Sequence, residues 1–296
     1  MSEHAKKSLK VAVQLLVSAA LIAFVIHKID LTQVKQLLMR PAGLPWVVVA
    51  LLLFNASKIA GALRLNVYQR HIGVHLSEQQ NLKLYYAGMF LNMFLPGGIG
   101  GDGYKILVLH RRDGTPVRKL LGITLADRVS GLLILLLLLC LLVPSLQLPF
   151  DSVAPIAAAC SVAICAAYVL LHRWLLNMVG ARMLVVFGYG FAVQTLQLAC
   201  TAFLLLYLQV PAADYPAYLA VFLVSSVAAV LPLSFGGLGA REVTFFYCMR
   251  FLHLDTAHGV VASSGFFLIT LLSSLVGALF LGGFSLKRKQ AEPPAA

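Results

Sequence analysis

The sequence predicts an all-α membrane protein, a polytopic helical bundle in which nearly the whole chain crosses or enters a lipid bilayer. Hydrophobic residues make up 60% of its 296 residues and charged residues only 11%, and the mean hydropathy is +0.89. Because a soluble domain carries about a quarter charged residues, a water-exposed fold does not suit this composition. Apolar runs recur from end to end with short polar gaps between them. We therefore expect a single integrated membrane domain.

Six apolar runs are long enough to span the bilayer. Each provides about 17 to 25 mostly apolar residues, which cross the hydrocarbon core at about 1.5 Å rise per residue. The first run is flanked by lysines but lacks a small-x-small cleavage site, so we interpret it as a retained signal anchor. The predicted full spans are residues 9–26, 44–63, 120–143, 152–171, 184–208 and 260–284.

Two further apolar stretches, residues 84–107 and 218–251, are broken by Pro and Gly clusters. Short cytoplasmic loops carry an excess of Lys and Arg, so basic residues indicate the side of each loop. The linkers 144–151 and 209–216 contain neither and should lie outside, whereas the basic loops on both sides of the first broken stretch should be cytoplasmic. Each broken stretch is therefore predicted to enter and return on one side as a re-entrant hairpin. Both chain termini are expected in the cytoplasm.

The two broken stretches share a motif. LPGGIGGDGYK at residues 95–105 aligns with LPLSFGGLGAR at residues 231–241 at an offset of 231 − 95 = 136, with five of eleven positions identical. The same shift carries the first three spans onto the last three, with opposite predicted orientations. We interpret this as an inverted repeat of residues 1–143 and 144–296, a construction found in many secondary transporters. The alternative is a chance match between Gly-rich segments in a chain with 23 glycines.

The motif backbone is expected to line a protein-enclosed or watery cavity, because lipid cannot satisfy non-helical backbone groups at membrane depth. Proline removes a helical hydrogen bond and glycine permits tight turns. The half-helices that follow the turns would direct their N-terminal amides inward, where such ends attract anions. The predicted hinges are Pro96, Gly100, Gly101, Gly103, Pro232, Gly236, Gly237 and Gly239.

Ionisable residues gather at the same places. Near the bilayer centre each costs at least about 2.5 kcal/mol, so function is the default hypothesis for them. The candidate ligands of a phosphate or phosphodiester head group are Lys105, Arg128 and Arg241, with arginine suited to bidentate binding. The candidate counter-ions or proton sites are Asp102, Asp127 and Glu242, and Lys58 is a candidate cavity residue.

A structural role is the alternative for several of these side chains. Lys58, Lys105 and Arg128 could extend toward the interface, and Arg241 could pair with Glu242. Arg64 is interpreted as the cytoplasmic end of the second span. His172, His253 and His258 fall at predicted loop edges, where interfacial histidines need no special role.

Other site classes find no support in the sequence. The formal charge of +12 resides in short clusters beside the spans, as in cytoplasmic membrane loops, so we expect no nucleic-acid partner. The five cysteines lie in apolar stretches without metal-ligand spacing, and we expect no metal and no cofactor. The sequence contains no Gly-x-Ser-x-Gly nucleophile elbow, no His-Glu-x-x-His zinc motif and no P-loop. We therefore expect no enzymatic activity.

The second motif, extended to Glu242, resembles the signature of the lysylphosphatidylglycerol synthase transmembrane-region family. The first motif with the preceding Asn92, and the pair Asp127-Arg128, are similar to the family's other characteristic stretches. The resemblance adds Ser234 to the candidate anion ligands and Asn92 to the cavity candidates. Lys105 stands where the family more usually has Arg, so a bidentate role there is doubtful.

The resemblance also implies a function. It points to a bacterial inner-membrane protein related to the flippase half of multiple-peptide-resistance enzymes, which moves aminoacylated phosphatidylglycerol between leaflets. The family's large synthases carry a C-terminal aminoacyltransferase domain. No such domain precedes Ala296 here, so lysyl transfer is expected to be absent.

The leading hypothesis is a flippase that moves an anionic or polyprenyl-linked lipid between leaflets, with membrane lipids as its ligands. One alternative is an integral membrane glycosyltransferase-type enzyme using a lipid-phosphate donor, with Asp102, Asp127 or Glu242 as general base. Another is an accessory subunit of a lipid or envelope synthesis complex. A separate transferase or synthase partner is compatible with all three.

Overall fold

The computed structural model describes residues 43–95, 98–146, 152–230 and 239–282, and within these ranges the regular structure is entirely helical. The α-helices are α3 (Leu44–His71), α4 (Glu78–Phe94), α5 (Gly100–Asp113), α6 (Val117–Leu142), α7 (Val153–Leu176), α8 (Ala181–Leu208), α9 (Tyr215–Val230), α10 (Ala240–Phe251) and α11 (Thr256–Leu275). Three short 3₁₀ segments adjoin them, η2 (Val143–Ser145), η3 (Ala212–Asp214) and η4 (Val276–Phe280). The all-α prediction is confirmed for this part of the chain.

Six of the described helices are long and apolar enough to cross a membrane. Five of them, α3, α6, α7, α8 and α11, correspond to predicted spans. The remaining predicted span, residues 9–26, lies outside the described residues. The sixth helix is Ala212–Val230, which combines η3 and α9 and which the sequence analysis assigned to a hairpin arm. The chain is therefore a multi-pass membrane protein, with one more helix of spanning length than predicted between residues 43 and 282.

The outer surface of the bundle is apolar. In α7 only Ala157, Tyr168 and His172 are buried, whereas Trp174 is 82% exposed and Val162 is 71% exposed. A water-soluble protein rarely exposes a continuous apolar face of this extent. Lipid is the natural covering for this face.

Both broken stretches fold back on themselves as antiparallel helical hairpins. In the first, the Tyr85 ring of α4 lies 5.6 Å from the Lys105 ammonium of α5. In the second, the Ser226 hydroxyl near the end of α9 accepts a hydrogen bond from Arg241 near the start of α10. The Tyr218 hydroxyl at the other end of α9 reaches the Asp255 carbonyl beyond α10.

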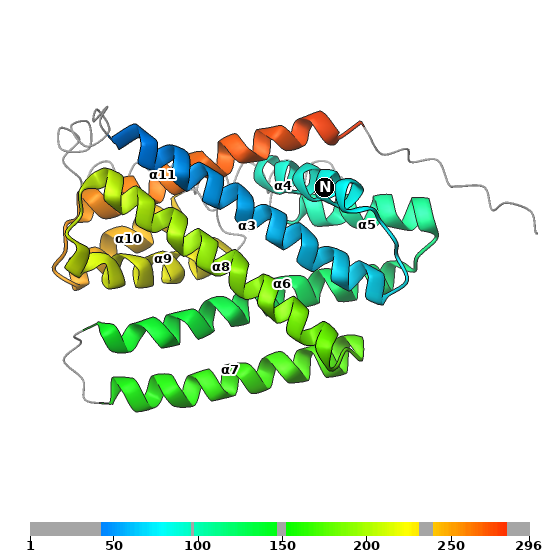
Figure 1. Cartoon of the computed structure of the whole chain (residues 1–296), viewed down its shortest axis with the longest axis horizontal. Coiled ribbons are helices and arrows are strands. Elements are labelled where there is room, and N and C mark those ends of the chain that lie inside the picture. Colours follow the sequence, from blue (N-terminus) through cyan, green and yellow to red (C-terminus); the bar gives the residue numbers. More distant parts are fainter. Residues whose placement is uncertain (1–42, 96–97, 147–151, 231–238, 283–296) are drawn as a thin grey trace, which may run out of the picture.

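Helices α3 and α8 cross the centre of the bundle in opposite directions (Figure 1). Gly43 lies against Tyr207, and Gly190 lies against Arg64, so the start of one helix meets the end of the other. These helices are equivalent under the repeat, since they begin at residues 44 and 181 and end at residues 71 and 208.

The equivalence extends to the following helices. Helices α4 and α9 begin at residues 78 and 215, and each is followed by a short return helix and a long helix. The contacts between the two halves are also reciprocal. Helix α4 of the first half packs on α11 and η4 of the second, and helix α9 of the second half packs on α6 and η2 of the first. With equivalent central helices running in opposite directions, this is the arrangement of an inverted repeat. The boundary between residues 143 and 144 stays a prediction.

The connections fall at two ends of the bundle (Figure 1). At one end α5 and α7 finish and α6 and α8 begin, and the residues close to these termini include Arg111, Arg112, Arg118, Arg173 and Arg182. At the other end α6 and α8 finish and α7 and α9 begin. These five arginines, which entered the prediction of sidedness, are thus gathered at a common end.

Candidate functional site

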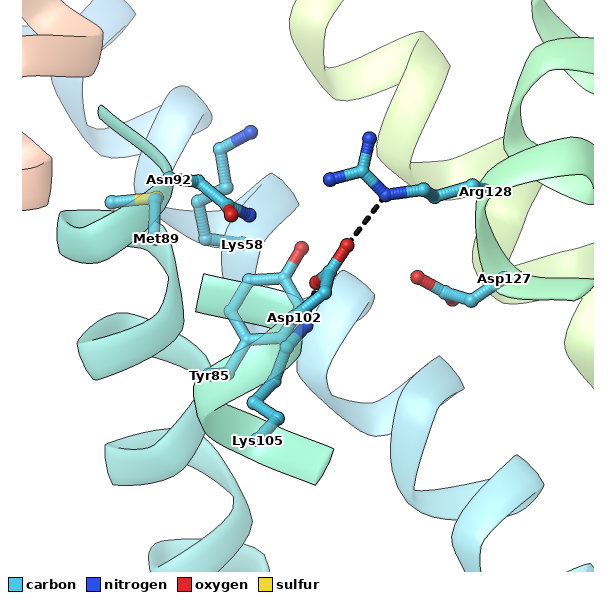
Figure 2. A pocket seen from close by; sticks show the side chains of 8 residues that line it. All are labelled: Lys58, Tyr85, Met89, Asn92, Asp102, Lys105, Asp127 and Arg128. Atoms are coloured by element: carbon cyan, nitrogen blue, oxygen red, sulfur yellow. Dashed lines mark hydrogen bonds and ion pairs between the residues drawn. The ribbon is translucent and has the colours of Figure 1, made fainter. Parts of the chain in front are cut away.

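Helices α3, α4, α5 and α6 enclose a cavity of about 240 Å³ (Figure 2). Six of its eight lining residues are among the predicted site residues. The two that the sequence analysis missed are Tyr85 and Met89, which lie seven and three residues before Asn92 on α4. Helical periodicity puts these three on one face, and that spacing could have identified them. The lining residues are Lys58, Tyr85, Met89, Asn92, Asp102, Lys105, Asp127 and Arg128.

The turn between α4 and α5 positions Asp102 at the cavity. Gly98 has a φ of +62°, a backbone conformation that favours glycine. The Gly101 amide donates a hydrogen bond of 2.7 Å to the Asn92 side-chain oxygen. A Cβ atom at Gly101 would collide with the Gly88 carbonyl, so close backbone approach requires glycine at this position.

The predicted hinge glycines have different surroundings. Gly100, Gly101 and Gly103 form the beginning of α5, and Gly103 has no neighbour that an added Cβ would meet. Gly239 has a φ of +84° and caps α10. A hinge role for these residues stays a prediction. The remaining predicted hinges, Pro96, Pro232, Gly236 and Gly237, and the candidate ligand Ser234 lie outside the described residues.

Asp102 lies between two cations. Its carboxylate accepts a hydrogen bond of 2.5 Å from Arg128 Nε and forms an ion pair of 2.7 Å with Lys105 Nζ. Arg128 also donates from Nη2 to the Gly98 carbonyl, which joins α6 to the turn of the hairpin. The Lys105 side chain is only 12% exposed. Its ammonium is directed into the protein and does not extend to an interface.

Arg64 is a site residue that the sequence analysis misinterpreted. Its guanidinium forms an ion pair of 2.8 Å with Asp127, and its side chain is 9% exposed. The interpretation of Arg64 as a span end was wrong because α3 continues to His71 and is followed by Gly73, with a φ of +87°. The helix thus extends about two turns past Arg64 and carries it inside the bundle.

Lys58 reaches the cavity from α3 without a carboxylate partner. Its ammonium lies 4.3 Å from the centre of the Phe54 ring, and the ion pairs of the described residues do not include it. The charges of both Arg241 and Arg64 act on it. Figure 2 shows Lys58 and Arg128 reaching toward the cavity from opposite sides. Lys58 therefore lines the cavity and is also within the electrostatic influence of Arg241 on the second hairpin.

Arg241 and Glu242 have separate partners. The Glu242 carboxylate accepts hydrogen bonds from the Gly239 amide at 2.8 Å and the Ser263 hydroxyl at 3.1 Å. Arg241 donates to the Ser226 hydroxyl at 3.2 Å, and its guanidinium lies 5.4 and 5.0 Å from two phenylalanine rings. The described ion pairs do not join the two residues, but the charge of Glu242 acts on Arg241, so the alternative that they pair structurally stays open.

Among the described residues, the interior of the bundle carries more positive than negative charge. A buried charge needs a partner, and an unmatched cation near the middle of a bilayer is costly. The excess therefore favours binding of an anion. The described residues contain no group of three His, Cys, Asp or Glu side chains that could hold a metal ion. Five cations, Lys58, Arg64, Lys105, Arg128 and Arg241, stand against three carboxylates, Asp102, Asp127 and Glu242.

Comparison with known proteins identifies a family. No curated protein matches the chain. The family model described as the lysylphosphatidylglycerol synthase TM region matches residues 11–181, which is more than half of the chain. The match includes the first hairpin and the pair Asp127-Arg128, but it ends before the second motif at residues 231–242, whose resemblance stays a prediction. The chain belongs to the lysylphosphatidylglycerol synthase transmembrane-region family.

Proposed function

We propose that this protein is a flippase that moves a lipid with an anionic phosphate head group between the leaflets of a bacterial inner membrane. The observation that carries the proposal is the excess of positive charge among the described interior residues, above all Lys58, which lines the cavity and takes part in none of the described ion pairs. A phosphodiester or a polyprenyl phosphate would supply the missing negative charge. The protein would leave the lipid covalently unchanged.

The head group would bind between Lys58 and Arg128. Arg128 is suited to this because its side chain is 37% exposed although it is paired with Asp102. A phosphate oxygen can accept two parallel hydrogen bonds from a guanidinium, and Lys58 would contribute a second positive charge. Acyl or prenyl chains would remain in the surrounding lipid, since the cavity of about 240 Å³ is too small for them.

The inverted repeat supports alternating access. Each of its two hairpins carries a cation near the bundle interior, Lys105 on α5 and Arg241 on α10. The charge of Arg241 also acts on Lys58. In transporters of this construction, rocking of one repeat against the other opens a central site to each side in turn. The head group would pass from the first group of cations to the second by way of Lys58.

The clustering of basic loop residues at one end of the bundle supports the proposed orientation, with that end and both termini in the cytoplasm. The state of Asp102 and Asp127, two of the three candidate general bases, supports transport over catalysis. Asp102 and Asp127 are each paired with a cation, which weakens a carboxylate as general base. Any transferase would act as a separate partner.

Leaflet exchange of fluorescent phosphatidylglycerol and phosphatidylethanolamine in proteoliposomes tests the proposal. The wild type should accelerate phosphatidylglycerol exchange over empty vesicles, and Lys58→Met should reduce the acceleration by about tenfold, which corresponds to about 1.4 kcal/mol. Lys83→Met is the matched control, because Lys83 is exposed on α4. Exchange equal to empty vesicles for the wild type would reject phosphatidylglycerol as substrate. A new covalent lipid product would favour the enzyme alternative.

A further inference from the structure

A second polar cluster joins α3, α6 and α7 outside the anion cavity. The Tyr68 hydroxyl of α3 lies 2.7 Å from His172 Nε2 of α7 and 3.0 Å from the Ser130 hydroxyl of α6. All three residues have 0% exposure. The sequence interpretation of His172 as an interfacial loop histidine was wrong, because α7 continues to Leu176 and buries the side that carries Tyr168 and His172.

The backbone determines which nitrogen of His172 carries a proton. Nδ1 lies 2.8 Å from the Tyr168 carbonyl, and a carbonyl can only accept, so Nδ1 donates. Nε2 then has two possible roles. In neutral His172 it accepts a hydrogen bond from Tyr68, and in protonated His172 it donates one to Tyr68.

Protonation of His172 would reverse the hydrogen bonds of the cluster. When Tyr68 donates to Nε2, its oxygen can accept only from Ser130. When Nε2 donates, Tyr68 donates to Ser130, and the Ser130 hydroxyl donates to the Asp127 carbonyl at 3.2 Å. That carbonyl also accepts from Arg64 Nη2 at 3.0 Å. The chain of hydrogen bonds therefore ends at the ion pair beside the anion cavity.

The charged residue that acts on His172 belongs to the same Arg64–Asp127 ion pair. From α3, Arg64 acts directly on His172, and His71 at the helix end is bonded to the Leu176 carbonyl. On α6, the carboxylate of Asp127 is paired with Arg64.

The remaining neighbours of His172 contribute no charge. On α7 itself Tyr168 is a neutral neighbour, with its ring 4.2 Å from the His172 ring. From α8 the described contacts to Tyr168 are the Phe187 ring and the Met183 carbonyl. A positive charge on His172 thus has no partner of its own in the described residues.

We propose that His172 is a proton-binding site coupled to the anion cavity through Tyr68, Ser130 and the Arg64–Asp127 pair. A bound anion would compensate the extra positive charge, so anion binding would favour protonation of His172. By thermodynamic linkage, protonation would strengthen anion binding by the same factor. The coupling ion of the transporter would then be a proton. The identity of the anion rests on the proposed function, whereas the coupling of His172 to Asp127 does not.

The test is nitrogen NMR of the full chain with ¹⁵N-labelled histidine, in nanodiscs of phosphatidylcholine with and without phosphatidylglycerol. His172→Gln assigns the signal, and His258→Gln is the control, since His258 pairs with Asp255 in the loop before α11. The change of His172 from the neutral Nδ1–H form to imidazolium is followed as the pH is lowered. Asp127→Asn should shift this titration by about half a pH unit or more, and phosphatidylglycerol should shift it too.

Tyr68→Phe distinguishes coupling from simple proximity, because it keeps the ring and removes the hydroxyl. In that background Asp127→Asn should have at most about half its effect on the His172 titration. A titration that Asp127→Asn leaves unchanged, or the absence of an imidazolium signal at every pH at which the protein stays folded, would overturn the proposal. A response to Asp127→Asn without a response to phosphatidylglycerol would leave the coupling standing and reject that lipid as the ligand.

Discussion

Arg64 and Asp127 are 63 residues apart in sequence, yet their side chains form an ion pair of 2.8 Å inside the bundle. The pair joins α3 to α6, and Asp127 lines the cavity. Gly131 and Gly190 leave room for the guanidinium, since a Cβ atom at either position would lie 3.4 or 3.1 Å from Arg64 Nη1. The guanidinium is therefore held by packing from α6 and α8 as well as by its charge partner.

Replacing one partner of this ion pair should destabilise the protein more than replacing both partners. Asp127→Asn or Arg64→Met alone should lower the free energy of unfolding by about 3 to 5 kcal/mol, because each leaves a buried charge without its partner. The double variant should recover much of that loss. Thermal unfolding in detergent measures all four proteins. Additive losses in the double variant would show that the pair is not energetically coupled.

Gly101 and Gly103 offer a matched pair of substitutions in one helix turn. Gly101→Ala should destabilise the protein by about 1 to 3 kcal/mol, because its Cβ would collide with the Gly88 carbonyl. Gly103→Ala meets no neighbour and should stabilise α5 by up to about 1 kcal/mol through helix propensity. Thermal unfolding reports both effects. Impaired lipid exchange in a stable Gly103→Ala variant would support the predicted hinge role of that glycine.

Arg241 should contribute to transport through its planar cation. Its guanidinium lies 5.4 Å from the Phe222 ring and 5.0 Å from the Phe266 ring, an arrangement that ammonium reproduces less well. We expect Arg241→Gln to reduce phosphatidylglycerol exchange by about tenfold and Arg241→Lys to retain part of the activity. Arg250→Gln, exposed in the last turn of the same helix, is the control. Unchanged exchange in Arg241→Gln would remove the second hairpin from the pathway.

Asp255 should make stability depend on pH at the start of α11. Partial burial raises the pKa of Asp255, but hydrogen bonds from His258 and the Ala257 amide outweigh this and lower it overall. A lowered folded-state pKa stabilises above the unfolded value of about 3.9, and the stabilisation is lost as pH falls through the folded value. Asp255→Asn should therefore unfold at lower temperature than wild type at pH 7. The side chain is 40% exposed, so the difference should be below about 1 kcal/mol.

The pH profile of the unfolding temperature checks the role of Asp255. The gap between wild type and Asp255→Asn should close as the pH falls from the unfolded value of about 3.9 through the lower folded-state value, where the carboxylate of the wild type becomes protonated. A gap that persists unchanged at pH 3 would mean that shape, and not charge, distinguishes the two residues at this helix start.

The sequence by itself determined the class of the protein and much of the first site. Long apolar runs predict spanning helices because lipid leaves backbone groups no other hydrogen-bond partners. Lys58, Asp102, Lys105, Asp127 and Arg128 stood out for a related reason, since ionisable residues within apolar runs are costly and rare. The Pro and Gly breaks likewise predicted the hairpins, because those residues act on the local backbone.

Only the tertiary structure decided which polar residues are inside and which partners they have. Arg64 is followed by Asn66, Gln69 and Arg70, a sequence that is typical of a span end, and His172 precedes Arg173 and Trp174 in the same way. Both are buried because distant helices cover them, α6 and α8 around Arg64 and α3 and α6 around His172. Burial depends on packing between segments far apart in the chain, so the local sequence around a residue does not predict it.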